Sequence, residues 1–489
     1  MTLWTRPTLW TRPTPWMYPL CARSSPSPLS IDSSHHYATR SLRRSVPATQ
    51  APAAPTSRRS IRVCRTSFSL RFGVEIDRDF GQGGQSMYMN FWYPVVRSED
   101  LGSTPQKVRI LSHDLVVFRD ESGKPAVLSD TCIHRGASLS GGKCKEDGTV
   151  QCPYHGWRFN RDGVCIRIPS IGKTTKPPPR ARVDAYPVEE KYGILFAFLG
   201  DLPADQRPPI MPVDEHGTDE WRSTLVVFEI NYHYERSIEN GLDPAHNEYV
   251  HPTHGYQGER EDTYLMTELR PHQNNPWGYG FLSTFDAPPL KNPIMRQFRK
   301  EGGKMEAGSG TYGPNHMWTY INFSPKTAMH QYMFEAPIDE NRTRVFLLNQ
   351  RNIGFFKNSK MGAIGRLIKP RINAWLDKKI NERNMFIASQ DIKVMNNVKP
   401  TLTPPSRAKE LMMPADKVIL QYRDKLDEFE ARGWKLDMAA VRAAREQGDV
   451  IFAIPSPARR ETNAWVLDEA PRVAPRASAP QATLQAAGG

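Results

Sequence analysis

Two Cys/His pairs lie within one stretch of the chain, residues 131–163, TCIHRGASLSGGKCKEDGTVQCPYHGWRFNRDG. Cys132 and His134 form a C-x-H pair, and Cys152 and His155 form a C-x-x-H pair. Two thiolates and two imidazoles can hold a binuclear iron–sulfur cluster, with one iron on the sulfur side and the other on the nitrogen side. Because neutral imidazoles replace two thiolates, the potential of such a cluster rises, which suits an electron relay.

Both pairs need tight loops, because each must lie at a loop tip to close on one small inorganic core. The residues that provide this turn chemistry are Gly136, Gly141, Gly142, Pro153 and Gly156. Zinc is the alternative, since two Cys and two His are also a zinc set. Zinc-finger spacing, however, places two Cys first and two His later on a helix, whereas each pair here is mixed and lies among strand-like residues. The spacing therefore favours a Rieske [2Fe–2S] cluster.

A second candidate site lies in residues 236–255, RSIENGLDPAHNEYVHPTHG, as the pattern E-x3-D-x2-H-x4-H. Its members are Glu239, Asp243, His246 and His251. Asp243 is followed by a proline. An aspartate N-cap followed by proline at the first helical position is a common helix start, so a helix is predicted to start there. Another proline follows His251 and disfavours helical geometry at that residue. We therefore expect the helix to end there and the two imidazoles to converge.

Two histidines need a carboxylate to complete a facial triad for ferrous iron, and Asp391 is the candidate. On a helix, Ile387, Asp391, Val394 and Met395 would share one face, which places a charge in an apolar stripe. Such a charge is costly unless it is paired or bound to a metal. The alternatives are an ordinary polar cluster for the histidines and a basic partner for Asp391.

Strand-like segments surround the Cys/His pairs and predict a small antiparallel β-domain over 88–203. Its expected strands begin with MNFWYPVV near Met87 and continue at Val108–Leu111, Leu115–Phe118 and Pro125–Leu128, with a hairpin at Asp162-Gly163. After a Pro-rich linker, a second domain is predicted over 213–454. Its expected elements are strands at Thr224–Tyr232, Tyr279–Phe285, His316–Phe323, Gln331–Pro337 and Arg344–Asn349, then helices at Met361–Asn396 and Pro414–Arg432. Residues 455–489, rich in Ala, Pro, Arg and Ser, are expected to form a flexible tail.

The net charge of +13 is concentrated at the N-terminus. Residues 1–72 carry eleven Arg, no Lys and one acidic residue, a net of +10, which leaves +3 for the other 417 residues. This composition predicts an organelle transit peptide, with a generic disordered segment as the alternative, and no nucleic-acid partner. Six cysteines are too few for a disulfide scaffold, which fits a reducing compartment. No apolar run reaches the roughly 18 residues of a membrane span, so none is expected.

With both motifs in this order, the sequence resembles the catalytic subunits of the Rieske non-haem iron oxygenases over about residues 88–440. The stretch ENGLDPAHNEYVHPTHGYQGERE is similar to the pheophorbide a and chlorophyllide a oxygenase group of plastids, and EAPIDENRTRVFLLNQRN to vanillate O-demethylase oxygenase subunits. The resemblance implies an α+β protein, in which a small antiparallel β Rieske domain precedes a helix-grip (START-like) catalytic domain with an antiparallel sheet and long C-terminal helices.

The resemblance also implies roles for individual residues. Cys132, His134, Cys152 and His155 would ligate the cluster, and His246, His251 and Asp391 would hold the mononuclear Fe(II). Asp243 would act as the family's bridging aspartate, which connects an iron-ligand His to a cluster His of the neighbouring subunit in a homotrimer. The side chains Trp277, Phe281, Phe285, Met317 and Trp318 could line a pocket or simply form core.

No nicotinamide or flavin motif is visible in the sequence, so the electrons are expected from outside, from ferredoxin or a ferredoxin/flavin reductase. The expected reaction is insertion of oxygen from O2 into an organic, aromatic or tetrapyrrole-like substrate, by hydroxylation, oxidative demethylation or ring opening. The alternatives are an electron-transfer or redox-sensing Rieske protein and a zinc-stabilised interaction module. The resemblance favours a plastid over a mitochondrion.

Overall fold

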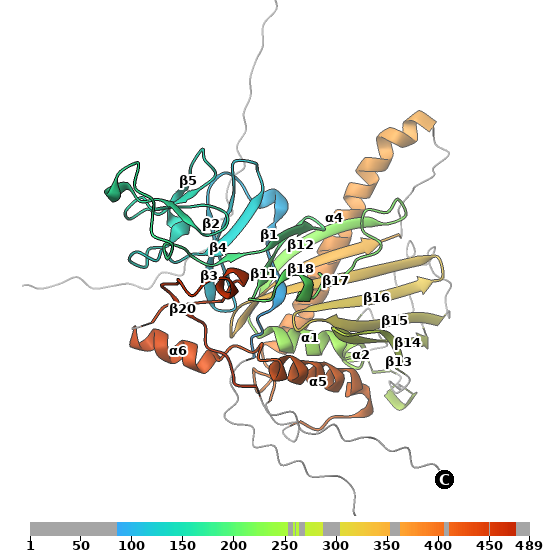
Figure 1. The fold of residues 1–489 in the computed structure, drawn as a ribbon. Helices are drawn as coiled ribbons and strands as arrows, with labels where there is room; N and C mark the ends of the chain where they lie inside the picture. Colours follow the sequence, from blue (N-terminus) through green and yellow to red (C-terminus); the bar gives the residue numbers. More distant parts are fainter. Residues whose placement is uncertain are drawn as a thin grey trace, which may run out of the picture. The chain divides into compact units, whose positions relative to one another are not determined.

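The computed structural model describes residues 86–252, 258–259, 261–263, 269–286, 304–352, 362–404, 410–448 and 450–475 (Figure 1). These residues belong to one unit of the chain, Asp77–Gly489. The transit peptide predicted over residues 1–72 lies outside the described residues.

The Cys/His pairs lie in a domain of three small antiparallel sheets. The first sheet has the strand order β1 (Phe91–Arg97), β11 (Ile194–Leu199) and β10 (Val188–Lys191). The second has the order β2 (Gln106–Ile110), β3 (His113–Arg119), β4 (Pro125–Ser129) and β9 (Ala185–Tyr186). The third has the order β5 (Lys143–Cys144), β6 (Val150–Gln151), β7 (Arg158–Phe159) and β8 (Cys165–Arg167). All six side chains of β11 are buried, since this strand lies between two others and is covered on both faces. The short apolar runs in the sequence correctly predicted β1 to β4.

The predicted hairpin between β7 and β8 is present, with Phe159 paired to Cys165. The side-chain oxygen of Asn160 accepts hydrogen bonds from the backbone N–H groups before and after Gly163, at 3.1 and 2.9 Å. Gly163 has a φ of +75°, and a Cβ at this position would lie 2.1 Å from the carbonyl oxygen of Val183. Both the backbone angle and the close approach therefore require glycine at this turn.

A seven-stranded antiparallel sheet forms the second domain. Its order is β12 (Arg222–Ile230), β18 (Arg342–Arg351), β17 (Thr327–Asp339), β16 (His316–Ser324), β15 (Lys304–Tyr312), β14 (Gly278–Asp286) and β13 (Arg270–Asn275). Five of these strands were predicted, whereas β13 and β15 were not. The glycines of β15 have a packing reason, because a Cβ on Gly310 would lie 2.4 Å from the Trp318 indole. A strand selected for small residues lacks the apolar alternation on which the prediction depends.

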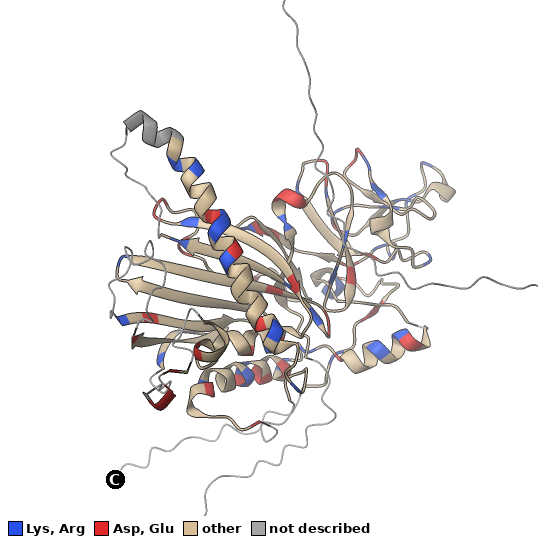
Figure 2. Cartoon of the chain, turned by 180° about the vertical axis from the view of Figure 1, so that it is seen from behind, with Lys and Arg blue, Asp and Glu red and all other residues tan. Residues whose placement is uncertain are grey.

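The described α-helices are α1 (Tyr234–Leu242), α2 (His246–Val250), α4 (Gly362–Met395), α5 (Lys417–Ala431) and α6 (Met438–Gln447). Helices α1, α4 and α5 pack against this sheet, and the α+β arrangement agrees with the prediction. Figure 2 shows α4 crossing one face of the sheet, with positions of basic and of acidic residues interspersed along the helix. Helix α5 ends as predicted, because Gly433 takes a left-handed φ of +72° just beyond it.

Short 3-10 helices and one small sheet complete the described elements. The 3-10 helices are Ser98–Asp100, Leu139–Gly141, Pro169–Ile171, Ala204–Gln206, Glu261–Thr263, Pro414–Asp416 and Pro457–Arg460. Strands β19 (Phe452–Ala453) and β20 (Asp468–Glu469) form a parallel pair.

The two domains share one apolar core. The ring of Phe196 in β11 packs edge-on against Phe334 in β17, with 5.1 Å between centroids. The backbone N–H of Leu111, beyond β2, donates to the carbonyl of Pro337 in β17 at 2.7 Å. The domain that carries the Cys/His pairs is therefore docked on the large sheet by apolar contacts and by backbone hydrogen bonds.

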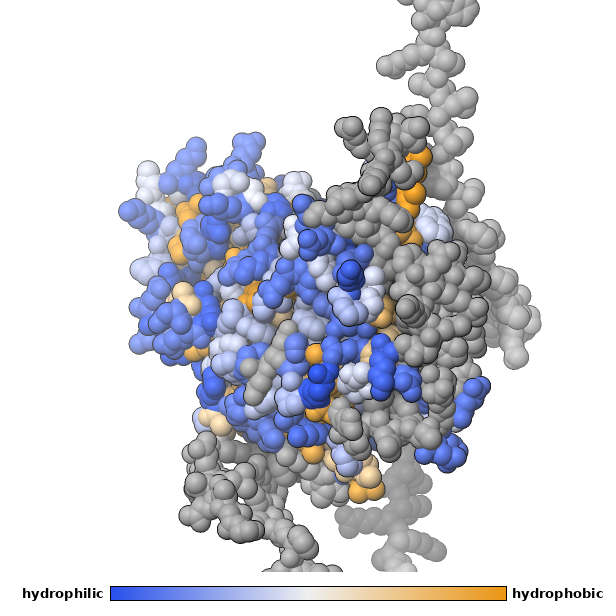
Figure 3. All heavy atoms as spheres, turned by 90° about the vertical axis from the view of Figure 1, so that its right-hand side faces the viewer, coloured by the Kyte–Doolittle hydropathy of each residue, from blue (hydrophilic) through white to orange (hydrophobic). Residues whose placement is uncertain are grey.

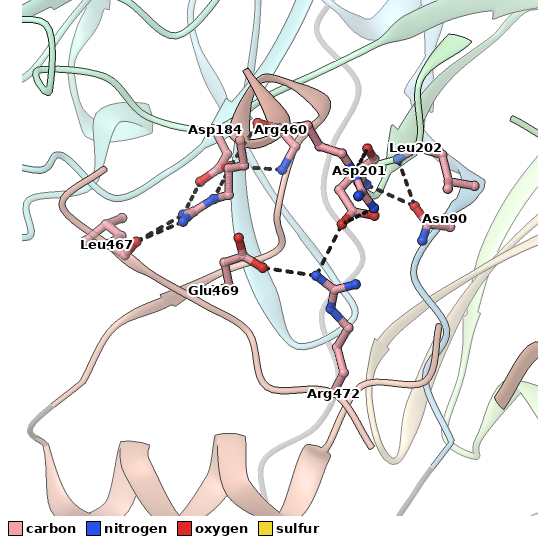
Figure 4. A network of polar contacts seen from close by, with 10 residues as sticks. Asn90, Asp184, Asp201, Leu202, Arg460, Leu467, Glu469 and Arg472 are labelled. Atoms are coloured by element: carbon pink, nitrogen blue, oxygen red, sulfur yellow. Dashed lines mark hydrogen bonds and ion pairs between the residues drawn. The ribbon is translucent and has the colours of Figure 1, made fainter. Parts of the chain in front are cut away.

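The expectation of a flexible tail from residue 455 is wrong for residues 456–475. Arg459 forms an ion pair with Asp184 at 2.8 Å, and Arg460 forms one with Asp201 at 2.9 Å. Figure 4 shows this network between the C-terminal segment and the buried acids of the Rieske domain. The composition of the segment resembles that of a disordered tail, but its arginines have buried partners that are distant in sequence. Residues 476–489 lie outside the described part.

The face shown in Figure 3 is mostly hydrophilic among the described residues, with apolar side chains in small groups. No described helix is both long enough and apolar enough to cross a membrane.

Candidate functional site

The two Cys/His loops have the same backbone pattern. In the first, Cys132 accepts a hydrogen bond from the N–H of Gly136 at 2.9 Å and donates its own N–H to Ala137 at 2.8 Å. In the second, Cys152 accepts from Gly156 at 3.2 Å and donates to the residue after it at 2.8 Å. Both glycines have a φ near +70°. Two equivalent loops thus present two equivalent Cys/His pairs.

The four predicted cluster ligands lie together, with the thiols buried and the imidazoles exposed. Cys132 and Cys152 are 1% and 2% exposed, while His134 and His155 lie at the surface with their Nδ1 atoms 3.1 Å apart. Burial, together with the neighbouring Cys152, raises the pKa of Cys132 to about 12. A buried thiol with a raised pKa is deprotonated when a bound metal balances its charge. Two buried sulfurs opposite two Nδ1 atoms fit a [2Fe–2S] cluster.

Two other cysteines near these loops have the packing role expected for small buried residues. Cys165 is buried, and Cys144 packs against the same apolar cluster. The indole of Trp157 stacks on His134, with 4.6 Å between ring centroids and 8° between planes. This contact holds the exposed imidazole in one orientation.

The second predicted site is brought together from helix α2, the residue that follows it, and helix α4. Nε2 of His251 lies 3.2 Å from Oδ1 of Asp391, and Nε2 of His246 lies 3.7 Å from the same oxygen. Each of the three residues offers one possible metal-binding atom, and these three atoms all lie within 4.8 Å of one another. The arrangement of two imidazoles and one carboxylate fits the facial triad of ferrous iron. Their role as iron ligands stays a prediction.

The local backbone explains how the two histidines converge. Helix α2 ends at Val250, and His251 takes an extended conformation with φ −111° and ψ 98°, as predicted from the following proline. Helix α2 begins at His246, three residues later than predicted, and Asp243 is the C-cap of α1. The Asp243 carboxylate nevertheless accepts from the N–H of Ala245 at 2.7 Å, which stabilises the turn between the two helices.

Both ring nitrogens that point away from Asp391 have oxygen partners. Nδ1 of His246 lies 2.6 Å from the carbonyl oxygen of Asp243, and Nδ1 of His251 lies 2.9 Å from Oε1 of Gln390. Such acceptors fix the tautomer with the proton on Nδ1 and leave Nε2 as the metal-binding atom. Each imidazole is therefore oriented for binding a metal through Nε2.

The ionisation of the two histidines differs. Burial lowers the pKa of His246, so its imidazole is neutral near pH 7 and suited to ligation. Burial also acts to lower the pKa of His251, but the hydrogen bond and charge of Asp391 outweigh it and raise the pKa. Burial raises the pKa of Asp243.

Some residues singled out in the sequence lie elsewhere. Glu239 forms ion pairs with Arg236 and Arg423 and does not join the histidines. Val394 is 44% exposed, so the predicted apolar stripe around Asp391 does not include it.

Of the five residues that could line a pocket, the apolar core contains Phe281, Met317 and Trp318. Trp277 packs against this core. A Cβ on Gly241 would lie 2.1 Å from the end of Met317, which shows how closely α1 packs on β16. These side chains therefore have a packing role.

Two residues of the site were not singled out in the sequence. Asn240 donates from Nδ2 to Oδ1 of Asp391 at 3.2 Å, and Gln390 contacts His251. Asn240 lies within the histidine motif and Gln390 directly precedes Asp391. Metal-binding side chains need hydrogen-bonding partners. The amide side chains next to predicted metal ligands could therefore have indicated these two residues in the sequence.

Comparison with known protein families agrees with this two-domain arrangement. Residues 91–187 match the Rieske [2Fe-2S] domain, and residues 230–432 match the vanillate O-demethylase oxygenase C-terminal domain. The first match contains both Cys/His pairs, and the second contains His246, His251 and Asp391.

Similar curated proteins include both groups that the sequence resembles. Pheophorbide a oxygenase of Arabidopsis thaliana is 28% identical over 65% of this chain and 60% of the relative. The 5,5'-dehydrodivanillate O-demethylase oxygenase subunit of a Sphingobium species is 32% identical over 51% of this chain and 55% of the relative. Phenoxybenzoate dioxygenase subunit alpha of Ectopseudomonas oleovorans is 36% identical over 33% of this chain and 42% of the relative. The chain thus spans about two to three fifths of the length of these relatives.

Solved structures support the same fold. NdmA of Pseudomonas putida CBB5, solved with caffeine, superposes with a TM-score of 0.53 at 23% identity, covering 70% of this chain and 91% of that one. Dicamba monooxygenase bound to dicamba gives a TM-score of 0.51 at 20% identity, covering 70% and 98%. The chain carries the two-domain architecture of Rieske oxygenase alpha subunits. Its C-terminal domain is of the vanillate O-demethylase type.

Proposed function

We propose that this protein is a Rieske-type oxygenase that uses O2 and externally supplied electrons to hydroxylate, oxidatively demethylate or open the ring of an organic substrate. The observation that carries the proposal is the convergence of His246, His251 and Asp391 in a chain that also contains a Rieske domain. A pure electron carrier or redox sensor has no use for such a triad. Relatives named for aromatic and tetrapyrrole substrates support a substrate of either class.

The protein's own residues hold and orient the two centres. Cys132, Cys152, His134 and His155 hold the [2Fe–2S] cluster, and His246, His251 and Asp391 hold the ferrous ion. When bound, the cluster supplies single electrons and the ferrous ion supplies the redox chemistry of oxygen insertion.

Asp243 is the proposed bridge toward a neighbouring subunit in a homotrimer. Its backbone carbonyl oxygen lies against His246, and its carboxylate is 28% exposed. The residue can therefore contact His246 and a surface group at the same time. This geometry supports its assignment as the link between an iron ligand and the cluster His134 or His155 of the next subunit.

The surface of the cluster loops favours an acidic electron donor such as ferredoxin. Residues 131–182 contain ten Lys or Arg and three acidic residues, a net of +7. The exposed Lys and Arg residues of this segment are Arg135, Lys143, Arg161, Lys173, Lys176 and Arg180. Opposite charge accelerates the encounter of a donor with such a surface. A reductase of similar charge could act in the same way.

Location in a plastid is the part of the proposal that depends on composition and relatives. Residues 1–72 are rich in Arg and nearly free of acids, and three of the similar proteins are named as chloroplastic.

The test is an electron paramagnetic resonance spectrum of the reduced, iron-loaded protein with nitric oxide added. We expect both a reduced-cluster signal and a high-spin ferrous–nitrosyl signal. In His246→Ala the cluster signal should persist, while the nitrosyl signal and O2-dependent turnover should be lost. His216→Ala is the control, because His216 contacts Ser223 and Gln350 instead. A cluster signal alone from iron-replete protein would favour the carrier.

A further inference from the structure

Three adjacent strands present a row of polar side chains to helix α4. Thr224 in β12 is opposite Asn349 in β18, which is opposite Gln331 in β17, so the three side chains share one face of the sheet. The hydroxyl of Thr224 donates to Oδ1 of Asn381 at 2.9 Å, and Nε2 of Gln331 donates to Oδ1 of Asn384 at 3.2 Å. Since both outer members of the row reach α4, this row faces the helix.

The middle member of the row is buried without a partner. Asn349 is 1% exposed, and neither its Oδ1 nor its Nδ2 has a hydrogen-bond partner among the described residues. Nδ2 of Asn384, which is 4% exposed, also has none there. A buried amide without hydrogen bonds costs stability, and a bound molecule with polar atoms can supply the hydrogen bonds that the protein does not. Both amides adjoin Gln331, which pairs with Asn349 and donates to Asn384, so together they mark a place for a polar ligand group.

This row lies on the same side of α4 as the candidate iron ligand Asp391. Asn384 and Asp391 are seven residues apart, which on a helix places them on one face about 10 Å apart along the axis. The next layer of the sheet along the strands is apolar and consists of Val226, Leu347 and Met333, paired in register. An apolar layer next to the amide row suits an aromatic ring with a polar group at one end.

The charged groups beyond the row are already paired. Arg222 and Arg351 both contact the carboxylate of Asp377, at 2.7 and 2.6 Å. The hydrogen-bonding groups beside Asn349 are therefore uncharged, the hydroxyl of Thr224 and the amide of Gln331. Uncharged groups of this kind bind a neutral C=O and N–H better than an anion.

We propose that Asn349 and Asn384 form a hydrogen-bonding subsite for the substrate of the oxygenase reaction. The substrate class is a neutral aromatic molecule that carries a carboxamide, lactam or imide group on the side opposite the oxidised carbon. An amide side chain offers one acceptor and one donor side by side, which complements adjacent C=O and N–H groups. This assignment rests on the proposed function, since that function places the reacting carbon near Asp391.

Binding of three probes to the anaerobic ferrous protein tests the assignment. The probes are para-methoxybenzamide, para-methylanisole and para-methoxybenzoate, measured by calorimetry without O2 or reductant. Failure of the oxygenase chemistry thus cannot affect this result. We expect the carboxamide to bind about tenfold more tightly than the methyl compound, which corresponds to the loss of one or two hydrogen bonds. In Asn349→Leu the two should bind equally.

Thermal unfolding separates ligand binding from a structural role. Asn349→Leu should keep or raise the melting temperature, because it removes two unpartnered buried atoms. Thr224→Val, the matched change beside it, should lower the melting temperature, because it leaves Asn381 without its donor. Three results would each overturn the assignment: equal affinity for the carboxamide and methyl probes, preference for the carboxylate, or no binding of any probe. A fall in melting temperature for Asn349→Leu with unchanged probe selectivity would also overturn it.

Discussion

Nε2 of His251 lies 3.2 Å from Oδ1 of Asp391, although one residue follows α2 and the other lies near the end of α4. The contact depends on docking α4 against the α1–α2 segment, where Asn240 also donates to Asp391. The candidate iron site is therefore a product of tertiary packing. Each ligand is oriented by a neighbour that does not itself belong to the triad.

Removal of the Gln390 side chain should weaken metal binding without removing a ligand. Oε1 of Gln390 lies 2.9 Å from Nδ1 of His251 and fixes the ring orientation. We expect Gln390→Ala to lower ferrous affinity by roughly 10–100-fold, the usual effect of losing such a partner. Competition with a chelator measures the affinity. Ser389→Ala, an exposed neighbour that donates to Phe386, is the control and should bind iron normally.

Much of the fold could be predicted from local sequence patterns. Apolar alternation located five of the seven strands in the large sheet, and an Asp-Gly turn located the β7–β8 hairpin. The spacing of the Cys and His residues located two short adjacent loops, and the structure brings the four predicted cluster ligands of these loops together. Asp391 could be selected because a carboxylate in a partly apolar helix face requires an explanation.

The remaining features depend on contacts that are distant along the chain. Strand β15 lacks a strand pattern because its glycines make room for Trp318. The segment 456–475 has the composition of a tail, and only its buried partners Asp184 and Asp201 reveal its order. Glu239 fits a metal motif by spacing, but it forms ion pairs with Arg236 in the same helix and with the distant Arg423. Sequence spacing alone contains none of this information.

Charge reversal on the cluster loops should slow reduction by an acidic donor. Lys173 and Lys176 are exposed in the segment with a net charge of +7. We expect Lys173→Glu/Lys176→Glu to lower the second-order rate of reduction by an acidic [2Fe–2S] ferredoxin by about tenfold at low salt, and less at high salt. Stopped-flow absorbance gives the rate.

The matched control for this pair carries the same charge change on α4, at Arg371→Glu/Lys378→Glu. It should be reduced at the unmodified rate, and dithionite should reduce all three proteins equally. Equal slowing in both pairs would indicate a general charge effect and contradict a docking surface at the cluster.

The buried acid Glu335 should make stability fall as pH rises. Its side chain is fully buried, accepts a hydrogen bond from Ser237 at 2.7 Å, and has a pKa raised by burial to about 8. Because the folded protein holds this proton more tightly than the unfolded chain, stability is lost between about pH 4.5 and pH 8.

We therefore expect Glu335→Gln, which keeps the acceptor for Ser237, to be more stable than the parent at about pH 8.5, by an amount on the order of a few kcal/mol. The difference should disappear near about pH 5. Denaturant unfolding at both pH values measures it, and a difference independent of pH would show that the carboxyl group is not the cause.

The ion pair between Asp184 and Arg459 should be essential to the docking of the C-terminal segment. Both side chains are nearly fully buried, and Asp184 also accepts hydrogen bonds from the backbone and hydroxyl of Ser456 at 2.9 Å each. Asp184→Ala leaves the Arg459 charge buried without its partner, which is expected to cost about 3–5 kcal/mol of unfolding free energy. Arg459→Met removes that charge, so the double variant should recover part of the loss.

Denaturant unfolding of the parent, the two single variants and the double variant completes the cycle, with proteolysis of residues 456–475 as a local readout. Additive losses in the double variant would show that the two side chains do not act on each other.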